Sequence, residues 1–142
     1  MSSVLLVGSA MMIVSLAITI LLFAAASRLL LWLSDSKTTG WPQMVAAFNL
    51  GIASLWILVV LTGSVWGWAL LYMALGLFDT LEPALYFSIV SFTTVGYGDV
   101  VLTPGWRLLA GMTATHGLLT FGLFTAFLVE VFNLPARTRA KT

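Results

Sequence analysis

Three long stretches of apolar residues constrain this chain more than any other feature. They run from Val4 to Leu33, from Met44 to about Tyr72 and from near Pro104 to Phe132. Each is long enough for a helix across a membrane, which needs about 20 residues. The 142 residues are 61% hydrophobic and 8% charged, whereas a soluble domain is about a quarter charged. We therefore expect a membrane protein with three spans, and spans in lipid must be helices or a closed barrel.

The composition also excludes several classes of protein. Six basic and five acidic residues are too few for a soluble enzyme, a disordered tail or a nucleic-acid binder, which needs clustered basic charge. Cysteine is absent, so a disulfide framework, a thiol nucleophile and a Cys-ligated metal are excluded. Enzyme motifs such as GxxxxGK and HExxH are missing as well. We predict that the chain is not an enzyme and uses no organic cofactor.

The segment from residue 79 to residue 101 lies between the second and third spans and cannot be another crossing. Glu82-Pro83 opens a short helix, predicted over residues 82–93, and Gly96 and Gly98 stop it. A helix of this length covers about half a bilayer. Irregular backbone at membrane depth is tolerated only where protein buries it or a water-filled path runs beside it. We therefore expect a re-entrant segment.

The loop after the short helix reads TTVGYGD over residues 93–99. It resembles the selectivity-filter signature of potassium channels, and the resemblance covers roughly residues 44–132. It implies an all-α pore module at 42–134, made of an outer helix at 42–72, a pore helix at 82–93, a filter at 94–99 and an inner helix at 104–132. The N-terminal span and a cytoplasmic connector (1–41) precede this module, and a short cytoplasmic tail (135–142) follows it.

The chemistry of such a filter can be stated from the residues. A cation stripped of water needs a ring of oxygens, and backbone carbonyls can supply it when successive ones point the same way. Glycines can adopt the positive φ angles that this requires. By resemblance, K⁺ is the permeant ion and the ligands are the carbonyls of Thr94, Val95, Gly96 and Tyr97 with the Thr94 hydroxyl. Gly98 completes the filter, and the side chains of Val95 and Tyr97 are expected to point away into packing.

One chain provides one loop, and a closed ring needs four, so the resemblance implies a homotetramer around a central pore. The C-terminal end of the pore helix would aim the negative end of its dipole at the membrane midplane. Residues beside the filter are expected to support it, and the Tyr86 hydroxyl could donate to the Asp99 carboxylate. These supporting residues are Asp99, Tyr86, Val90 and Thr93.

The inner helix carries the expected cavity lining and a candidate hinge. Four residues fall within an arc of about 80° and align with the pore-facing stripe of relatives: Leu118, Phe121, Thr125 and Val129. Gly117 stands where the family has its gating hinge, although a small residue also suits close helix packing. His116 is turned about 160° from Leu118, so we expect a neutral ring that hydrogen-bonds a neighbouring helix.

The basic residues predict the orientation. Arg28, Lys37 and the basic tail fall on one side and Arg107 on the other. The positive-inside rule then places the C-terminus in the cytoplasm and the N-terminus outside, in a multi-pass protein of the cell membrane. The far end of the second span has the look of an aromatic belt at the membrane interface, formed by Trp66, Trp68 and Tyr72.

These features predict passive, potassium-selective conduction. A voltage sensor needs several basic residues in one span, and the first span has Arg28 alone. The short tail leaves no room for a ligand-binding domain. Two alternatives stay open: a nonselective cation channel, or a non-conducting channel-like subunit that needs a partner. A regulatory partner could bind through the N-terminal helix. A transporter is disfavoured because no repeated half is present.

Overall fold

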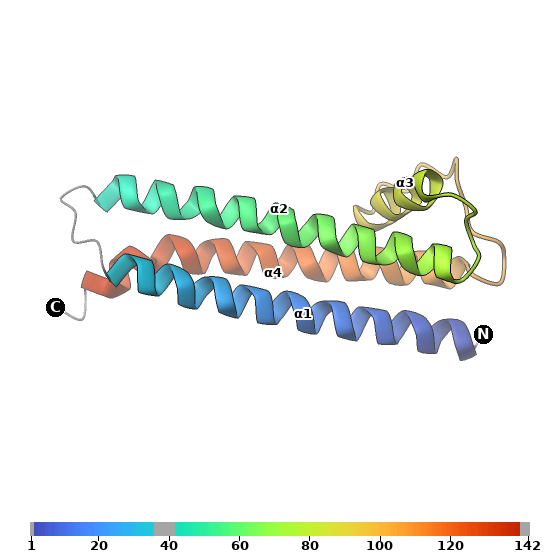
Figure 1. Ribbon diagram of the computed structural model, residues 1–142, viewed down its shortest axis with the longest axis horizontal. Coiled ribbons are helices and arrows are strands. Elements are labelled where there is room, and N and C mark those ends of the chain that lie inside the picture. The colour runs from blue at the N-terminus through green and yellow to red at the C-terminus, as the bar shows by residue number, and fades with distance from the viewer. Residues whose placement is uncertain (1, 36–41, 140–142) are drawn as a thin grey trace.

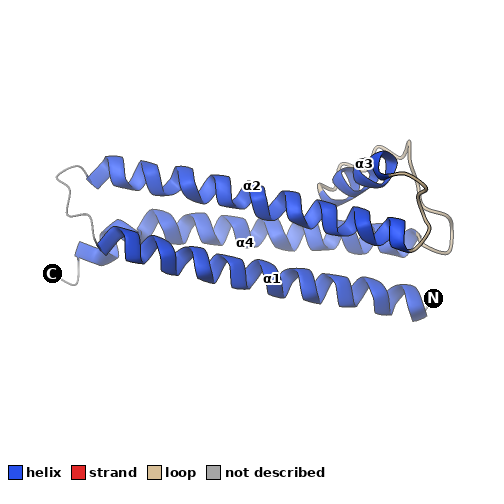
Figure 2. Ribbon diagram, viewed as in Figure 1, coloured by secondary structure: helices blue, strands red, loops and turns tan. Residues whose placement is uncertain are grey.

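The computed structural model describes residues 2–35 and 42–139. This part of the chain forms four helices and no strand (Figures 1 and 2). The helices are α1 (Ser2–Asp35), α2 (Pro42–Ala74), α3 (Leu81–Phe92) and α4 (Arg107–Arg139). Three of them contain segments long and apolar enough to cross a membrane, at Ser2–Leu29, Ala47–Ala74 and Arg107–Phe132. The predicted all-α membrane fold with three spans is therefore confirmed.

The three long helices lie side by side, and α3 sits at the end of the bundle where α2 finishes and α4 begins (Figure 1). Helices α1 and α4 run in the same direction, and α2 runs against them. The N-terminus lies at the α3 end and the C-terminus at the opposite end. This placement is what three crossings require, and the end that faces the cytoplasm stays a prediction.

Helix α4 differs most from its expected range of 104–132. It begins at Arg107 because Pro104 to Trp106 form a turn, in which the Trp106 N–H donates to the Thr103 carbonyl at 2.8 Å. It continues through Pro135 to Arg139, since a proline removes one backbone donor without having to end a membrane helix. The start of the expected tail is thus helical. Residues 140–142 and most of the connector, 36–41, lie outside the described residues.

The buried hydrophobic cluster beside α3 shows that part of the expected aromatic belt is wrong. Trp68 and Tyr72 are both 0% exposed and pack with Phe87 and Phe92 of α3, while Trp66 is 41% exposed. A belt residue keeps its polar end in the interface, whereas the polar ends of Trp68 and Tyr72 find hydrogen-bond partners inside the bundle. Two of the three predicted belt residues are therefore core.

Helix α1 packs chiefly along α4. Near the α3 end, Gly8 approaches Met112 so closely that a Cβ on it would lie 2.5 Å from the Met112 Sδ. Towards the other end, the Phe23 ring stacks on Phe127 with centroids 4.6 Å apart and packs edge-on to Phe124 at 5.5 Å. Helix α1 thus packs against α4 at two levels.

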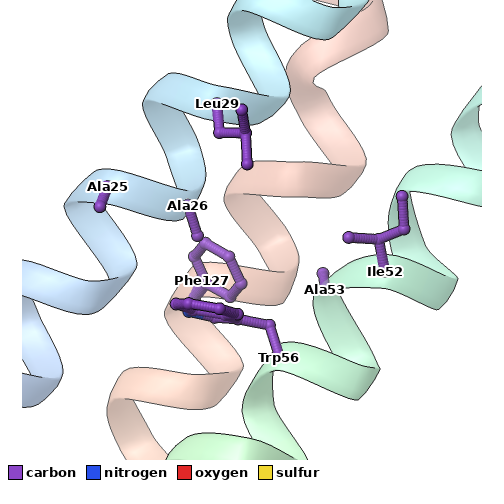
Figure 3. Close-up of a pocket in the computed structure, with 7 residues that line it drawn as sticks. All are labelled: Ala25, Ala26, Leu29, Ile52, Ala53, Trp56 and Phe127. Carbon is purple, nitrogen blue, oxygen red and sulfur yellow. The ribbon is translucent and has the colours of Figure 1, made fainter.

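A small apolar cavity of about 140 Å³ lies between α1, α2 and α4. Figure 3 shows the side chains of Trp56 and Phe127 pointing into this space from α2 and α4, with Ala25, Ala26 and Leu29 on the α1 side. The Trp56 Nε1 is buried and has no hydrogen-bond partner among the described residues.

Candidate functional site

Helix α3 is fixed in place before it reaches the loop that follows. Its first residue comes after Thr80, whose backbone is extended, and Glu82 in the first turn suits the positive end of the helix dipole. In the middle of the helix, the Ser88 Oγ donates to the Val65 carbonyl of α2 at 2.7 Å. Ala84, Ser88 and Phe92 of α3 are all 0% exposed. The helix therefore delivers its C-terminal end to a defined point beside α2 and α4.

The filter segment (residues 94–99) turns back over the end of α3. The N–H of Thr94 donates to the Ser91 carbonyl at 3.0 Å, and those of Val95 and Gly96 donate to the Val90 carbonyl at 3.0 and 3.2 Å. In a planar trans peptide, each carbonyl points opposite to the following N–H. The carbonyls of Thr93, Thr94 and Val95 are thus directed away from α3, so the first part of the segment carries a row of carbonyls on its outer side.

The backbone of the segment alternates in the sign of φ. Thr94, Gly96 and Gly98 have φ of 63°, 57° and 79°, and Val95 and Tyr97 between them do not have positive φ. This alternation cancels the usual strand pattern, in which carbonyls point to opposite sides in turn. The positive φ expected at the two glycines is observed.

Thr94 is the residue that sequence reasoning missed in this pattern. It is the only non-glycine residue with positive φ in the described chain, and a residue with a Cβ pays roughly 1–2 kcal/mol for that conformation. Such strain persists where the surroundings over-determine it, and it gathers at functional sites. Here the hydrogen bond from the Thr94 N–H to Ser91 and those of the next two residues hold it. No local sequence pattern predicts a positive φ at this threonine.

The side chains of the filter segment are open in a single copy of the chain. Val95 is 52% exposed and Tyr97 is 73% exposed. The packing expected around them is not supplied by the described residues of the same chain. Val90 behaves differently, because its side chain is buried while its carbonyl accepts the two filter N–H groups. The Thr93 Oγ1 donates to the Ile89 carbonyl at 2.7 Å and caps the end of α3.

Asp99 at the end of the segment is tied back to α3. The Tyr86 Oη donates to its Oδ2 at 2.6 Å, and its Oδ1 accepts the Val100 N–H at 3.0 Å. The Tyr86 hydroxyl lowers the pKa of Asp99, and the same bond raises the pKa of Tyr86. Tyr86 and Asp99, expected as partners from the sequence, are thus brought together.

The expected cavity stripe lies on the uncovered side of α4. Leu118 is 62% exposed, Phe121 is 36% exposed and Val129 is 56% exposed, and Thr125 is exposed as well. The Thr125 Oγ1 donates to the Phe121 carbonyl at 3.1 Å, which leaves its lone pairs free. Within these four residues, the Thr125 hydroxyl is the one polar side-chain group.

Gly117 faces the end of α3. A Cβ built on it would lie 1.8 Å from the Phe92 carbonyl oxygen. Only a glycine lets the α4 backbone approach the end of α3 this closely. Of the two interpretations of Gly117, this contact supports close packing.

His116 is 0% exposed, and its Nδ1 accepts a hydrogen bond from the Trp68 Nε1 at 2.7 Å. The expectation that its ring hydrogen-bonds a neighbouring helix is confirmed. One turn along, the Tyr72 and Thr113 hydroxyls are 2.5 Å apart. Sequence reasoning missed the α2 partners. The available sequence signal is spacing. Trp68 and Tyr72 are four residues apart, and their partners His116 and Thr113 are three residues apart on an antiparallel helix.

Comparison with known proteins identifies similar sequences over part of the chain. A family model described as "Ion channel" matches residues 54–133. The "Potassium voltage-gated channel subfamily A member 2" of Oncorhynchus mykiss is 39% identical over 57 residues, which are 39% of this chain and 12% of that protein. "Potassium voltage-gated channel subfamily A member 6" of Homo sapiens is 36% identical over 58 residues, 40% of this chain and 11% of that protein. The chain thus spans 12% or less of these relatives' length. No solved structure matches it.

Proposed function

Because this chain belongs to the ion channel family, we propose that it is a potassium-selective channel that conducts K⁺ passively. The observation that carries the proposal is the alternating φ of residues 94–98, combined with the N–H groups of Thr94, Val95 and Gly96, which donate to carbonyls of α3. A row of carbonyls replaces the hydration shell of a K⁺ ion in a filter of this kind. The carbonyls of Thr94, Val95, Gly96 and Tyr97 and the Thr94 hydroxyl would bind the ions, and Gly98 would end the row.

The ring needs four copies, so the proposed assembly is a homotetramer around the pore axis. The exposure of Val95 and Tyr97 in one copy supports this, because neighbouring copies would cover side chains that lie outside the row. The negative ends of four α3 dipoles would converge below the filter. Asp99, held by Tyr86, would place a carboxylate at each outer mouth.

The uncovered stripe of α4 would line the inner cavity in this assembly, through Leu118, Phe121, Thr125 and Val129. Gly117 would fix α4 against α3, and a hinge at the same residue is the competing role. The basic residues favour a cytoplasmic C-terminus and an outer N-terminus. Gating would not use a row of basic residues in the membrane, since Arg28 is the one basic residue of α1.

The experiment that tests the function is ion flux into liposomes from the purified protein, with K⁺ and Na⁺ measured side by side. We expect fast K⁺ flux and little Na⁺ flux. Gly96→Ala, which forces a Cβ onto a residue with φ of 57°, should abolish the flux. Gly51→Ala is the matched control, because a Cβ at Gly51 meets nothing within 4 Å.

Each other outcome favours a named alternative. Equal K⁺ and Na⁺ flux would replace the proposal with a nonselective cation channel. An intact tetramer without flux would indicate a non-conducting subunit, and flux restored by a co-assembled partner would support regulation through the N-terminal helix. Wild-type flux in Gly96→Ala would contradict the carbonyl-row mechanism.

A further inference from the structure

His116 is the single histidine of the chain, and its neutral tautomer can be assigned from its surroundings. The Trp68 Nε1 can only donate, and it lies 2.7 Å from the His116 Nδ1. Nδ1 must therefore be the unprotonated acceptor, and the ring proton sits on Nε2. That Nε2 is buried and has no hydrogen-bond partner among the described residues. A buried donor left unpaired is costly, so the bond to Trp68 outweighs that cost in selecting the tautomer.

The imidazole lies against the end of the pore helix. The His116 and Phe92 ring centroids are 5.4 Å apart and the rings are perpendicular. The next residue, Gly117, meets the Phe92 carbonyl. Phe92 is the last residue of α3 and is 0% exposed, and the filter segment begins two residues later. A rotation of the imidazole would therefore change its contact with Phe92, two residues before Thr94.

The bond to Trp68 is what prevents that rotation. Trp68 is 0% exposed and packs within the same cluster as Phe92. Its ring centroid is 5.9 Å from that of His116. On α4, the Thr120 Oγ1 donates to the His116 carbonyl at 2.8 Å. The imidazole is therefore held from α2 through Nδ1 and faces α3 with its other side.

We propose that His116 is a positioning residue for ion selection. Its Nε2-protonated imidazole, oriented by Trp68, holds Phe92 and the end of α3 where the filter segment must start. The inference rests on the proposed function, because it assigns His116 a role in the selectivity of that site. Functional groups must be held within about 0.5 Å of their productive geometry, and His116 contacts the last residue of α3 from α4.

The first test is spectroscopic and does not depend on conduction. Protein labelled with ¹⁵N in histidine gives one imidazole signal set, since there is one histidine. At neutral pH in lipid, the ¹⁵N shifts and one-bond couplings should show a protonated Nε2 and an unprotonated, hydrogen-bonded Nδ1. A proton on Nδ1 would overturn the proposal. If wild-type protein failed to select K⁺, the proposed function would fall and this spectrum would still decide the tautomer.

The second test compares variants by their K⁺/Na⁺ permeability ratio. His116→Leu removes the acceptor, and Trp68→Phe removes the donor. Each should lower the ratio about tenfold, as expected for one net hydrogen bond at the upper end of its usual range. His116→Asn places its amide oxygen the same number of bonds from Cα as Nδ1, so it can still accept from Trp68, but it lacks the ring that meets Phe92. Its ratio should therefore lie between that of His116→Leu and that of the wild type.

A merely structural role predicts a different pattern. All three variants would then lose thermal stability according to the volume removed, with the ratio unchanged in protein that still assembles. A wild-type ratio in both His116→Leu and Trp68→Phe would overturn the proposal. If His116→Leu fails to assemble, Trp68→Phe decides, because a wild-type ratio in that variant alone would overturn the proposal.

Discussion

Replacing Gly117 by alanine tests how α4 positions the filter. The added Cβ would lie 1.8 Å from the Phe92 carbonyl oxygen, 2.8 Å from its carbonyl carbon and 3.3 Å from its Cα. All three atoms belong to the backbone, so no side-chain rotation relieves the clash. Real Cβ contacts essentially never fall below 3.0 Å. The α3 end and α4 must therefore separate by more than the difference between these distances, over 1 Å, which exceeds the roughly 0.5 Å that a functional site tolerates.

We expect Gly117→Ala to lower the stability of the assembled protein by about 1–3 kcal/mol, the usual cost of overpacking, and to lower the K⁺/Na⁺ flux ratio. Gly63→Ala in α2 is the matched control, because its Cβ meets nothing within 4 Å. Alanine also favours a helix over glycine by up to about 1 kcal/mol, so this control should be neutral or slightly stabilised.

The assays are thermal dissociation in detergent and ion flux into liposomes, run on both variants. Equal stability and equal flux ratio in Gly117→Ala and Gly63→Ala would refute the packing argument. Unchanged stability with an altered open probability in Gly117→Ala would instead support the gating hinge.

Three further predictions follow from the site, the bundle and the charges. The pKa of Asp99 is held below its usual range by Tyr86, so the stabilisation from this pair is present above about pH 4 and is lost as the pH falls through the lowered pKa. Tyr86→Phe should raise the pKa of the Asp99 carboxyl, measured as the midpoint of its NMR titration. An unchanged midpoint would contradict the hydrogen bond from Tyr86. Phe23→Ala should cost about 1–3 kcal/mol, because it removes two ring contacts worth about 0.5–1.5 kcal/mol each. Leu21→Ala, at a residue 68% exposed, should cost far less in the same thermal assay. Planar-bilayer currents should lack a steep voltage dependence, because Arg28 is the one basic residue of α1. A steep rise of open probability with voltage would contradict this prediction.

The architecture was predictable because membrane spans are set by local composition. Three spans and one short helix are predicted from the apolar stretches that end at Leu33 and Tyr72 and from the break before Glu82. In the structure, the corresponding helix ends lie within two residues of these positions. The C-terminal end of α4 was not predictable in this way. Pro135 is a helix breaker in water, and its effect in a bundle depends on neighbours that lie elsewhere in the chain.

In the site, too, features set by neighbouring residues were predictable, and features set by distant residues were not. Positive φ at Gly96 and Gly98 follows from glycine alone, and the direction of His116 follows from helical periodicity. The burial of Trp68 does not, because its hydrogen-bond partner is 48 residues away. Nor does positive φ at Thr94, which depends on carbonyls at the end of α3. Pairings between distant segments are invisible to a window of sequence.

The central claim is that carbonyls of residues 94–97 bind a row of K⁺ ions on a fourfold axis. Anomalous scattering from crystals of the assembled protein grown in Rb⁺ tests it most directly. The account predicts several peaks spaced along the axis at the level of the Val95 and Gly96 carbonyls. Crystals that show an ordered filter segment and an axis without such peaks would contradict it.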